Sequence, residues 1–290
     1  MNGLLVLDKP AGLTSHDVVA IVRRATGEKS IGHLGTLDPM ATGVLPLLLG
    51  KYTRLAQFFN QAEKQYTGNI RFGFATDTYD AEGTPASELK PLTLSLEALQ
   101  TLSKKFCGEI DQVPPIFSAK KINGTPAHKL ARAGAEVPVK PARITIHHFK
   151  LTSLEGDTAA FTISVSAGGY VRSVAHELGQ LAGCGAHLSS LRRIRAGAFT
   201  LDHAITIDHL KASTPAQLEI LLPHPRTLLP EMPCVTIDDQ LAGRLRNGMQ
   251  CNLPDLSQAT LIKIFTTPTE LLAIGRRVAG TLVQPIVVLG

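Results

Sequence analysis

One carboxylate, Asp38, lies in a loop of small and apolar residues, GHLGTLDPMATG, that spans residues 32–43. Pro39 restricts the backbone of Asp38 to extended conformations, and the glycines on either side permit tight turns. The apolar run that follows the loop would exclude water, as a nucleophile or a general base requires. A turn or helix-capping aspartate would carry the same local pattern, so the loop alone leaves both interpretations open.

A second polar stretch, GGYVRS at residues 168–173, could supply a partner for this carboxylate. Alternation along an extended segment would place Tyr170 and Arg172 on the same side. An arginine that faces Asp38 would keep the carboxylate ionised and oriented at neutral pH. Tyr66, in KQYTG, fits a half-buried aromatic residue of a strand. No second acid lies near Asp38 in the sequence, which argues against the paired carboxylates of a glycosidase.

Composition is compatible with a nucleic-acid partner but does not require one. The 290-residue chain is 44% hydrophobic, which is enough for a packed core, and its net charge is +5. Basic residues recur in small groups, such as Lys104–Lys105 and Arg276–Arg277, in a pattern that suits a polyanion. An ordinary basic protein would have the same charge. Aromatic content is 5% with no Trp, which argues against a broad stacking platform for single strands.

The four cysteines lie far apart, without CxxC or Cys/His pairs at metal-ligand spacing, and are expected to be free, mostly buried thiols. No apolar stretch is long enough to span a bilayer, and the first residues lack the features of a signal peptide. We therefore expect a cytoplasmic protein.

Hydrophobic periodicity predicts the elements that must position these residues. A strand at 4–7 precedes an amphipathic helix that runs from Thr14 or Ser15 to Gly27. Further strands are predicted at 64–74, 143–151, 159–166 and 188–200, and helices at 53–60, within 95–108 and after Tyr170.

Two breaks in composition suggest how the chain is divided. The segment 114–140 is rich in Pro, Gly and Lys and is predicted to be an insertion over the surface. After a Pro-rich break at 223–233, short β patterns alternate to the end of the chain. We therefore predict one domain over residues 1–232 and a small β-rich domain over residues 233–290.

Five motifs, taken together and in this order, resemble those of the TruB family of bacterial tRNA pseudouridine synthases. They are KPAGLTSHDVV (9–19), GHLGTLDPMATGVLPLLLGKYTR (32–54), KQYTGNIRFG (64–73), TDTYDAEG (76–83) and GGYVRSVAHELG (168–179). The resemblance extends over roughly residues 3 to 200, and the loop around Asp38 is a highly specific signature by itself.

The resemblance implies a mixed α+β fold, in which a mainly antiparallel sheet flanked by helices forms the catalytic domain. Residues 114–140 would form a thumb-like insertion that clasps RNA, and residues 233–290 a PUA-like domain. The implied reaction is the isomerisation of uridine 55 in the T loop of tRNA to pseudouridine, with no cofactor and no metal. The implied partner is tRNA, bound through its T arm and acceptor end by a monomer that needs no protein partner and no membrane.

The resemblance also implies roles for individual residues, of which Asp38 is the catalytic aspartate. It would either attack C1′ of the ribose or remove the C2′ proton. The other implied roles are Tyr66 stacking on the flipped base, Arg172 pairing with the aspartate, Tyr170 as a neighbouring active-site tyrosine, Leu191 in the uracil pocket, and His33 entering the T loop.

Further residues are implied on the substrate side of the site. Lys9 belongs to the family's KP element beside the active site, where we expect packing next to the substrate, not catalysis. The basic residues of the thumb-like insertion are expected to contact phosphate; they are Lys120, Lys121, Lys129 and Arg132.

Two alternatives differ from this interpretation in class or in mode of action. The RNA-guided synthase of box H/ACA particles shares the aspartate loop, but the thumb-like insertion and the lack of Lys-rich tails favour a self-sufficient enzyme. A purely RNA-binding or RNA-folding module would have a broken active site, whereas Asp38, Tyr66, Tyr170 and Arg172 are all present.

Overall fold

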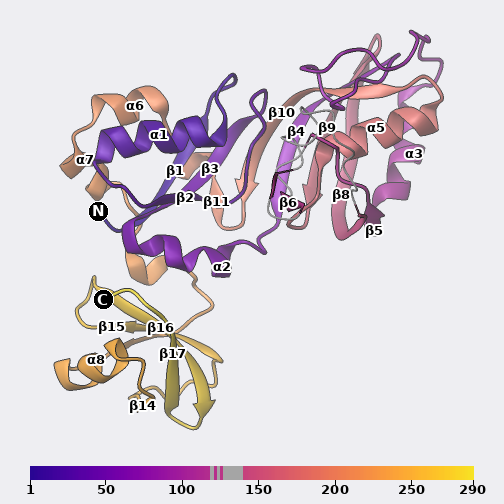
Figure 1. The fold of residues 1–290 in the computed structure, drawn as a ribbon. Helices are drawn as coiled ribbons and strands as arrows, with labels where there is room; N and C mark the ends of the chain where they lie inside the picture. The colour runs from indigo at the N-terminus through magenta and orange to yellow at the C-terminus, as the bar shows by residue number, and fades with distance from the viewer. Residues whose placement is uncertain (118–120, 123–124, 127–139) are drawn as a thin grey trace.

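A computed structural model describes residues 1–117, 121–122, 125–126 and 140–290 and arranges them in a large and a small sheet with flanking helices (Figure 1). The ten-stranded sheet has the order β12-β1-β3-β10-β4-β9-β8-β5, with β2 paired to β3 and β11 to β10. Most neighbouring strands are antiparallel; β1 with β12 and β10 with β3 are parallel. The predicted mixed α+β fold with a mainly antiparallel sheet is thus confirmed.

The bounds of the strands in this sheet are β1 (Gly3–Lys9), β2 (Ile31–His33), β3 (Thr42–Leu49), β4 (Lys64–Phe72), β5 (Gly108–Gln112), β8 (Ala142–Glu155), β9 (Thr158–Val165), β10 (Ala186–Ala196), β11 (Phe199–Thr200) and β12 (Ile205–Thr206). Its helices are α1 (Ser15–Thr26), α2 (Ala56–Phe59), α3 (Leu96–Ser103), α5 (Val171–Ala182), α6 (Ile207–Ala212) and α7 (Pro215–Ile220). Short 3-10 turns lie at Gly50–Leu55, Lys104–Phe106, Leu201–His203 and Pro225–Thr227, and a separate two-stranded sheet joins β6 (Lys121–Ile122) to β7 (Thr125–Pro126).

The first half of the sheet is built around α1, whose ends lie where the sequence predicts. Thr14 accepts a hydrogen bond from the Asp17 amide at 3.0 Å while the Asp17 carboxylate accepts one from the Thr14 amide at 2.9 Å, which forms a capping box. Gly27 ends the helix with a left-handed backbone. The helices α6 and α7 pack beside α1 (Figure 1).

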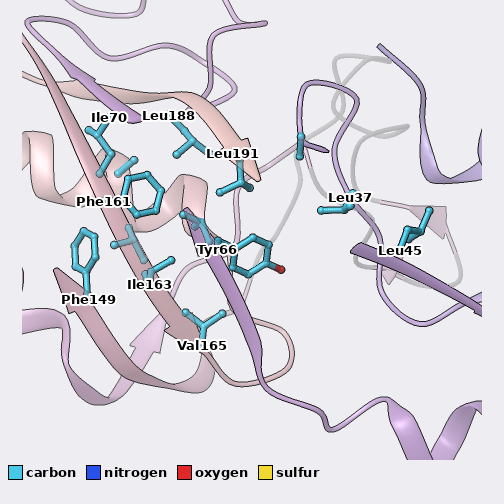
Figure 2. Packing of buried hydrophobic residues seen from close by; sticks show 14 of the residues in the cluster. Leu37, Leu45, Tyr66, Ile70, Phe149, Phe161, Ile163, Val165, Leu188 and Leu191 are labelled. Atoms are coloured by element: carbon cyan, nitrogen blue, oxygen red, sulfur yellow. The ribbon is translucent and has the colours of Figure 1, made fainter. Parts of the chain in front are cut away.

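The second half of the sheet carries an aromatic core beneath α3 and α5. The α3 helix packs on β8 and α5 packs on β10. The rings of Phe149 and Phe161 meet edge to face at 6.0 Å, and Figure 2 shows them next to Ile163 and Ile70. This packing gives the sheet a rigid face at the place where the side chain of Tyr66 projects from β4.

The two halves meet at β10. Along most of its length β10 pairs antiparallel with β4, and over Arg192 and Arg193 it also pairs with β3 in parallel. Because β3 follows the Asp38 loop and β4 carries Tyr66, this junction brings two segments distant in sequence to the same strand.

The small sheet lies at the C-terminal end of the chain and has the order β13-β15-β16-β17-β14. Its elements are β13 (Cys234–Thr236), α8 (Asp239–Arg246), β14 (Cys251–Asn252), β15 (Leu261–Phe265), β16 (Leu271–Ala279) and β17 (Leu282–Val288). It shares a hydrophobic cluster with the large sheet, in which Phe265 and Ile274 join Leu4, Val6 and Leu48. The small sheet therefore packs on the large one through apolar contact. The division into domains 1–232 and 233–290 stays a prediction.

Several local predictions need correction. The stretch 168–173 is not one extended segment, because α5 begins at Val171 and Arg172 lies in its first turn. A helix, α8, interrupts the β pattern after Pro233. Only two of the four cysteines, Cys184 and Cys251, are buried, although all four are free. Among the described helices, none combines the length and the hydrophobicity needed to cross a bilayer.

Candidate active site

The loop that carries Asp38 is held by backbone and hydroxyl contacts on both sides of the carboxylate. The buried Ser15 hydroxyl accepts from the Leu37 amide at 2.8 Å and donates to the Leu37 carbonyl at 3.1 Å. On the other side, the Gly12 amide donates to the Pro39 carbonyl at 2.9 Å. These contacts anchor the residues before and after Asp38 and so fix the direction of its side chain.

Arg172 is the cation that faces Asp38. Its Nη2 donates to Oδ1 at 3.0 Å, and its Nε lies 2.9 Å from Oδ2. The same guanidinium donates to the carbonyls of Thr78 at 3.1 Å and Phe117 at 3.0 Å. With 6% of its side chain exposed, Arg172 is held almost entirely by protein groups and cannot swing away freely.

A second carboxylate, Asp80, shares this arginine. Its Oδ2 lies 3.4 Å from Nη1 of Arg172, and its Oδ1 accepts from the Thr78 hydroxyl at 2.6 Å and from the Glu82 amide at 3.1 Å. Asp80 is almost fully buried, whereas the Asp38 side chain keeps 33% of its surface exposed. Asp80 therefore orients the arginine, and Asp38 is the carboxylate that a ligand can reach.

Burial and the neighbouring charges act in opposite directions on the pKa of Asp38. Burial, the largest influence, raises the pKa of Asp38 above its usual range, Arg172 lowers it, and the charge of Asp80 raises it again. A carboxylate in these surroundings is poorly solvated and depends on one arginine for its charge, which suits a nucleophile or a general base.

A cavity of about 280 Å³ opens beside Asp38. The predicted residues Tyr66, Tyr170, Arg172 and Leu191 line it together with Asp38. Figure 2 shows Tyr66 next to Leu191 and Val165, with its hydroxyl directed out of the cluster toward the side where Leu37 lies. Gln112 holds the backbone of Tyr170, accepting from its amide at 2.7 Å and donating to its carbonyl at 3.0 Å.

His33 lies on the opposite side of the Asp38 loop. It lines a separate cavity of about 580 Å³ together with His16, Glu82 and, at the shared wall, Asp38 and Arg172. Its Nδ1 is buried without a hydrogen-bond partner among the described residues, and burial lowers the pKa of His33. The structure thus places His33 next to Asp38 but outside the cavity that holds Tyr66.

Lys9 requires a correction, because it does not reach either cavity. Its side chain is fully buried, and its ammonium donates to the carbonyls of Pro10 at 2.9 Å, Leu13 at 2.5 Å and Pro39 at 3.2 Å. Burial lowers the pKa of Lys9 to about 8. An assignment of Lys9 to substrate binding is therefore wrong, and its contacts support the loop from beneath.

Of the basic residues predicted to contact phosphate, Lys120, Lys129 and Arg132 lie outside the described residues. Lys121 belongs to β6, for which the backbone alone is described. The role of Asp80 was missed from the sequence, although TDTYDAEG was among the motifs that carried the resemblance. In the part of the chain that the structure describes, no three His, Cys, Asp or Glu side chains are grouped to bind a metal.

Comparisons with known proteins show which family and fold the chain resembles. Residues 23–171 match the family model "TruB family pseudouridylate synthase (N terminal domain)", and residues 172–223 match "tRNA pseudouridylate synthase B C-terminal domain". A protein of Solibacter usitatus named tRNA pseudouridine synthase B is 44% identical over 294 residues, which cover the whole of both chains. One with the same name from Geotalea uraniireducens is 46% identical over 208 residues, 72% of this chain and 67% of that protein.

Among solved structures, the chain resembles the Cbf5-Nop10-Gar1 complex with a TM-score of 0.66 and 27% identity, over 99% of this chain and 85% of that one. The archaeal box H/ACA sRNP Nop10-Cbf5 complex matches with a TM-score of 0.69 and 24% identity, over 99% and 86% of the two chains, and supports the fold alone.

Proposed function

The chain belongs to the TruB family of pseudouridylate synthases, and from this premise we propose that it isomerises uridine 55 in the T loop of tRNA to pseudouridine, using Asp38. One observation carries the proposal: a reachable, poorly solvated carboxylate paired with a buried arginine, in a cavity lined by tyrosine and leucine side chains. The name shared by the curated relatives supports tRNA as the substrate.

The reaction exchanges one bond of the ribose for another. The bond from C1′ to N1 of uracil breaks, the base rotates in place, and C1′ bonds to C5, which then loses its proton while N1 gains one. Asp38 would either attack C1′ or remove the proton at C2′. Both routes need an ionised carboxylate, and this is the state that Arg172 favours.

The cavity can hold a flipped pyrimidine against two side chains. We assign Tyr66, which lines the same cavity as Asp38, to stacking on the base, where its hydroxyl can help to take the C5 proton, and Leu191 to the apolar wall. Tyr170 closes another side of the cavity. His33, in the neighbouring cavity, would enter the T loop near the space that the flipped nucleotide leaves.

The remaining RNA contacts follow from the same proposal. Lys120, Lys121, Lys129 and Arg132 would bind phosphates of the T arm, and the small C-terminal sheet, as a PUA-like domain, would contact the acceptor end. Because the substrate is tRNA, we place the enzyme in the cytoplasm. We also propose that it acts as a monomer. An RNA-guided activity is less well supported, because the Cbf5-Nop10-Gar1 complex matches at 27% identity, whereas the relatives named tRNA pseudouridine synthase B match at 37–46%.

The decisive experiment supplies a T-arm transcript with tritium at C5 of uridine 55 alone, without guide RNA, and follows tritium release. We expect release by the native enzyme and none by Asp38→Asn. Asp157→Asn is the matched control, because Asp157 is an exposed aspartate paired with Arg71 outside both cavities. An inactive native enzyme, or an active Asp38→Asn variant, would contradict the proposal.

A further inference from the structure

Arg193, on β10, is a buried cation with an unusual set of partners. Its side chain is fully buried, and no carboxylate among the described residues pairs with it. Burying a guanidinium without a counter-ion is costly, and apolar residues of similar volume often stabilise such positions better. The presence of arginine here therefore calls for an explanation other than stability.

The guanidinium of Arg193 contacts both ends of the Asp38 loop. Its Nε donates to the Val44 carbonyl at 2.7 Å, just after the loop. Its Nη2 donates to the Gly35 carbonyl at 3.0 Å and its Nη1 to the Thr36 carbonyl at 3.4 Å, just before Asp38. The guanidinium donates to these carbonyls from three separate nitrogens in a rigid planar fork, whereas an ammonium would have to serve them all from a single nitrogen.

The backbone of Arg193 adds a second connection at the same point. It pairs with Tyr66 on β4 and with Gly43 on β3. The contact with Gly43 is so close that a Cβ on this glycine would lie 2.1 Å from the Arg193 carbonyl oxygen. One residue thus sets the distance between the strand that presents Tyr66 and the loop that presents Asp38.

We propose that Arg193 is a positioning residue for the reaction, which clamps both ends of the loop and thereby places Asp38 relative to Tyr66. The inference rests on the proposed function, because it assumes that these two side chains act on one nucleotide. Arg193 is enclosed by protein and touches no substrate, so it acts on the rate of the bound complex and leaves RNA affinity alone. Catalysis is sensitive to such placement, since a shift of about 1 Å can cost about 100-fold in rate.

The test compares Arg193→Lys and Arg193→Met with Arg192→Met. Arg192 is the adjacent residue on β10; it pairs with Asp8 at 2.7 Å and donates to the Thr42 hydroxyl at 3.3 Å, but it makes no hydrogen bond to the carbonyls of Gly35, Thr36 or Val44 that Arg193 holds. For each variant, tritium release gives kcat and KM, filter binding gives the Kd for the T arm, and thermal unfolding reports the fold. Hydrogen exchange at the Leu37 amide, which donates to Ser15, reports the order of the loop without any reaction.

We expect Arg193→Lys to fold, to lose about 100-fold in kcat with KM and Kd unchanged, and to exchange faster at Leu37. Arg192→Met should keep the native kcat and exchange rate. If Arg193→Met does not fold, Arg193→Lys decides the matter, because it keeps the charge and loses the fork. A native kcat in Arg193→Lys, or an equal fall in RNA affinity, would overturn the inference. An inactive native enzyme would instead contradict the proposed function, and the exchange rate would then decide the inference by itself: unchanged exchange at Leu37 would overturn it.

Discussion

Replacing Arg172 with Met removes the cation that favours the ionised form of Asp38. The variant loses a hydrogen bond of 3.0 Å to Oδ1 and a charge contact of 2.9 Å to Oδ2, and it leaves Asp80 unpaired as well. Breaking a buried ion pair by removing one partner costs about 3–5 kcal/mol. Because one third of the Asp38 side chain is exposed, solvent screens the ion pair, and we expect its loss to cost about 2–3 kcal/mol.

This free energy predicts both a fall in rate and a change in the pH profile. Because Arg172 stabilises the ionised carboxylate that reacts, losing about 2–3 kcal/mol of that stabilisation corresponds to roughly 100-fold in kcat at neutral pH. Burial already raises the pKa of Asp38, and the loss of Arg172 raises it further, so activity should recover as the pH is increased. A raised pKa also means that the folded state binds more protons than the unfolded chain. The free energy of unfolding of the variant should therefore fall as the pH rises through the range in which Asp38 ionises.

The assay is tritium release from the T-arm transcript across neutral and alkaline pH, with RNA affinity measured in parallel. Arg172→Lys is the matched control, because it keeps a positive charge near Asp38 and should retain more activity and a smaller shift of the profile. RNA affinity should change far less than kcat. Equal losses of affinity and kcat, or an unshifted acid limb, would refute the reasoning and indicate a phosphate contact instead.

Three further predictions concern the loop and the cavity. Gly43→Ala should lower the free energy of unfolding by about 3 kcal/mol, since φ is +102° and a backbone oxygen lies 2.1 Å from the new Cβ. Gly12→Ala, at φ +83° but in open space, should lower it by about 1 kcal/mol. Urea denaturation measures both. Lys9→Met leaves the carbonyls of Pro10 and Leu13 without this donor, while the Pro39 carbonyl keeps the Gly12 amide, and should cost about 2 kcal/mol of stability; a weakened Kd for RNA in the folded protein would contradict its buried position. Tyr66→Ala should lower kcat/KM about 10–100-fold through lost stacking, while Tyr66→Phe should keep KM; equal effects would argue against stacking.

Local patterns predicted much of the fold correctly. The helix after Thr14 could be placed to within a residue because its capping box and its terminal glycine act within one turn. The strand at Tyr66 could be recognised by its alternation. Prediction failed for α8 because this short, polar helix lies among β patterns. At GGYVRS the predicted helix after Tyr170 is confirmed by α5, and only the extended arrangement of Tyr170 and Arg172 is wrong.

For the candidate site, too, the sequence predicted some features and only the tertiary structure showed the others. Residue types and motif order were enough to identify the family and to single out Asp38, Tyr66 and Arg172 as candidate site residues, because both are read along the chain. The partners of these residues could not be read in that way. Arg172 is 134 positions from Asp38, and their contact depends on how α5 packs on the sheet.

The same holds for the residues that support the loop. Lys9 is basic and lies in a family motif, yet it is fully buried and bound to carbonyls, so its charge is unavailable to RNA. Arg193 would be expected at the surface from its residue type alone, and its contacts arise because β10 pairs with both β3 and β4. The sequence gives the residue types directly, and these indicate which chemistry is possible. Burial and strand order follow from long-range packing, and they decide which charges meet substrate and which hold the backbone in place.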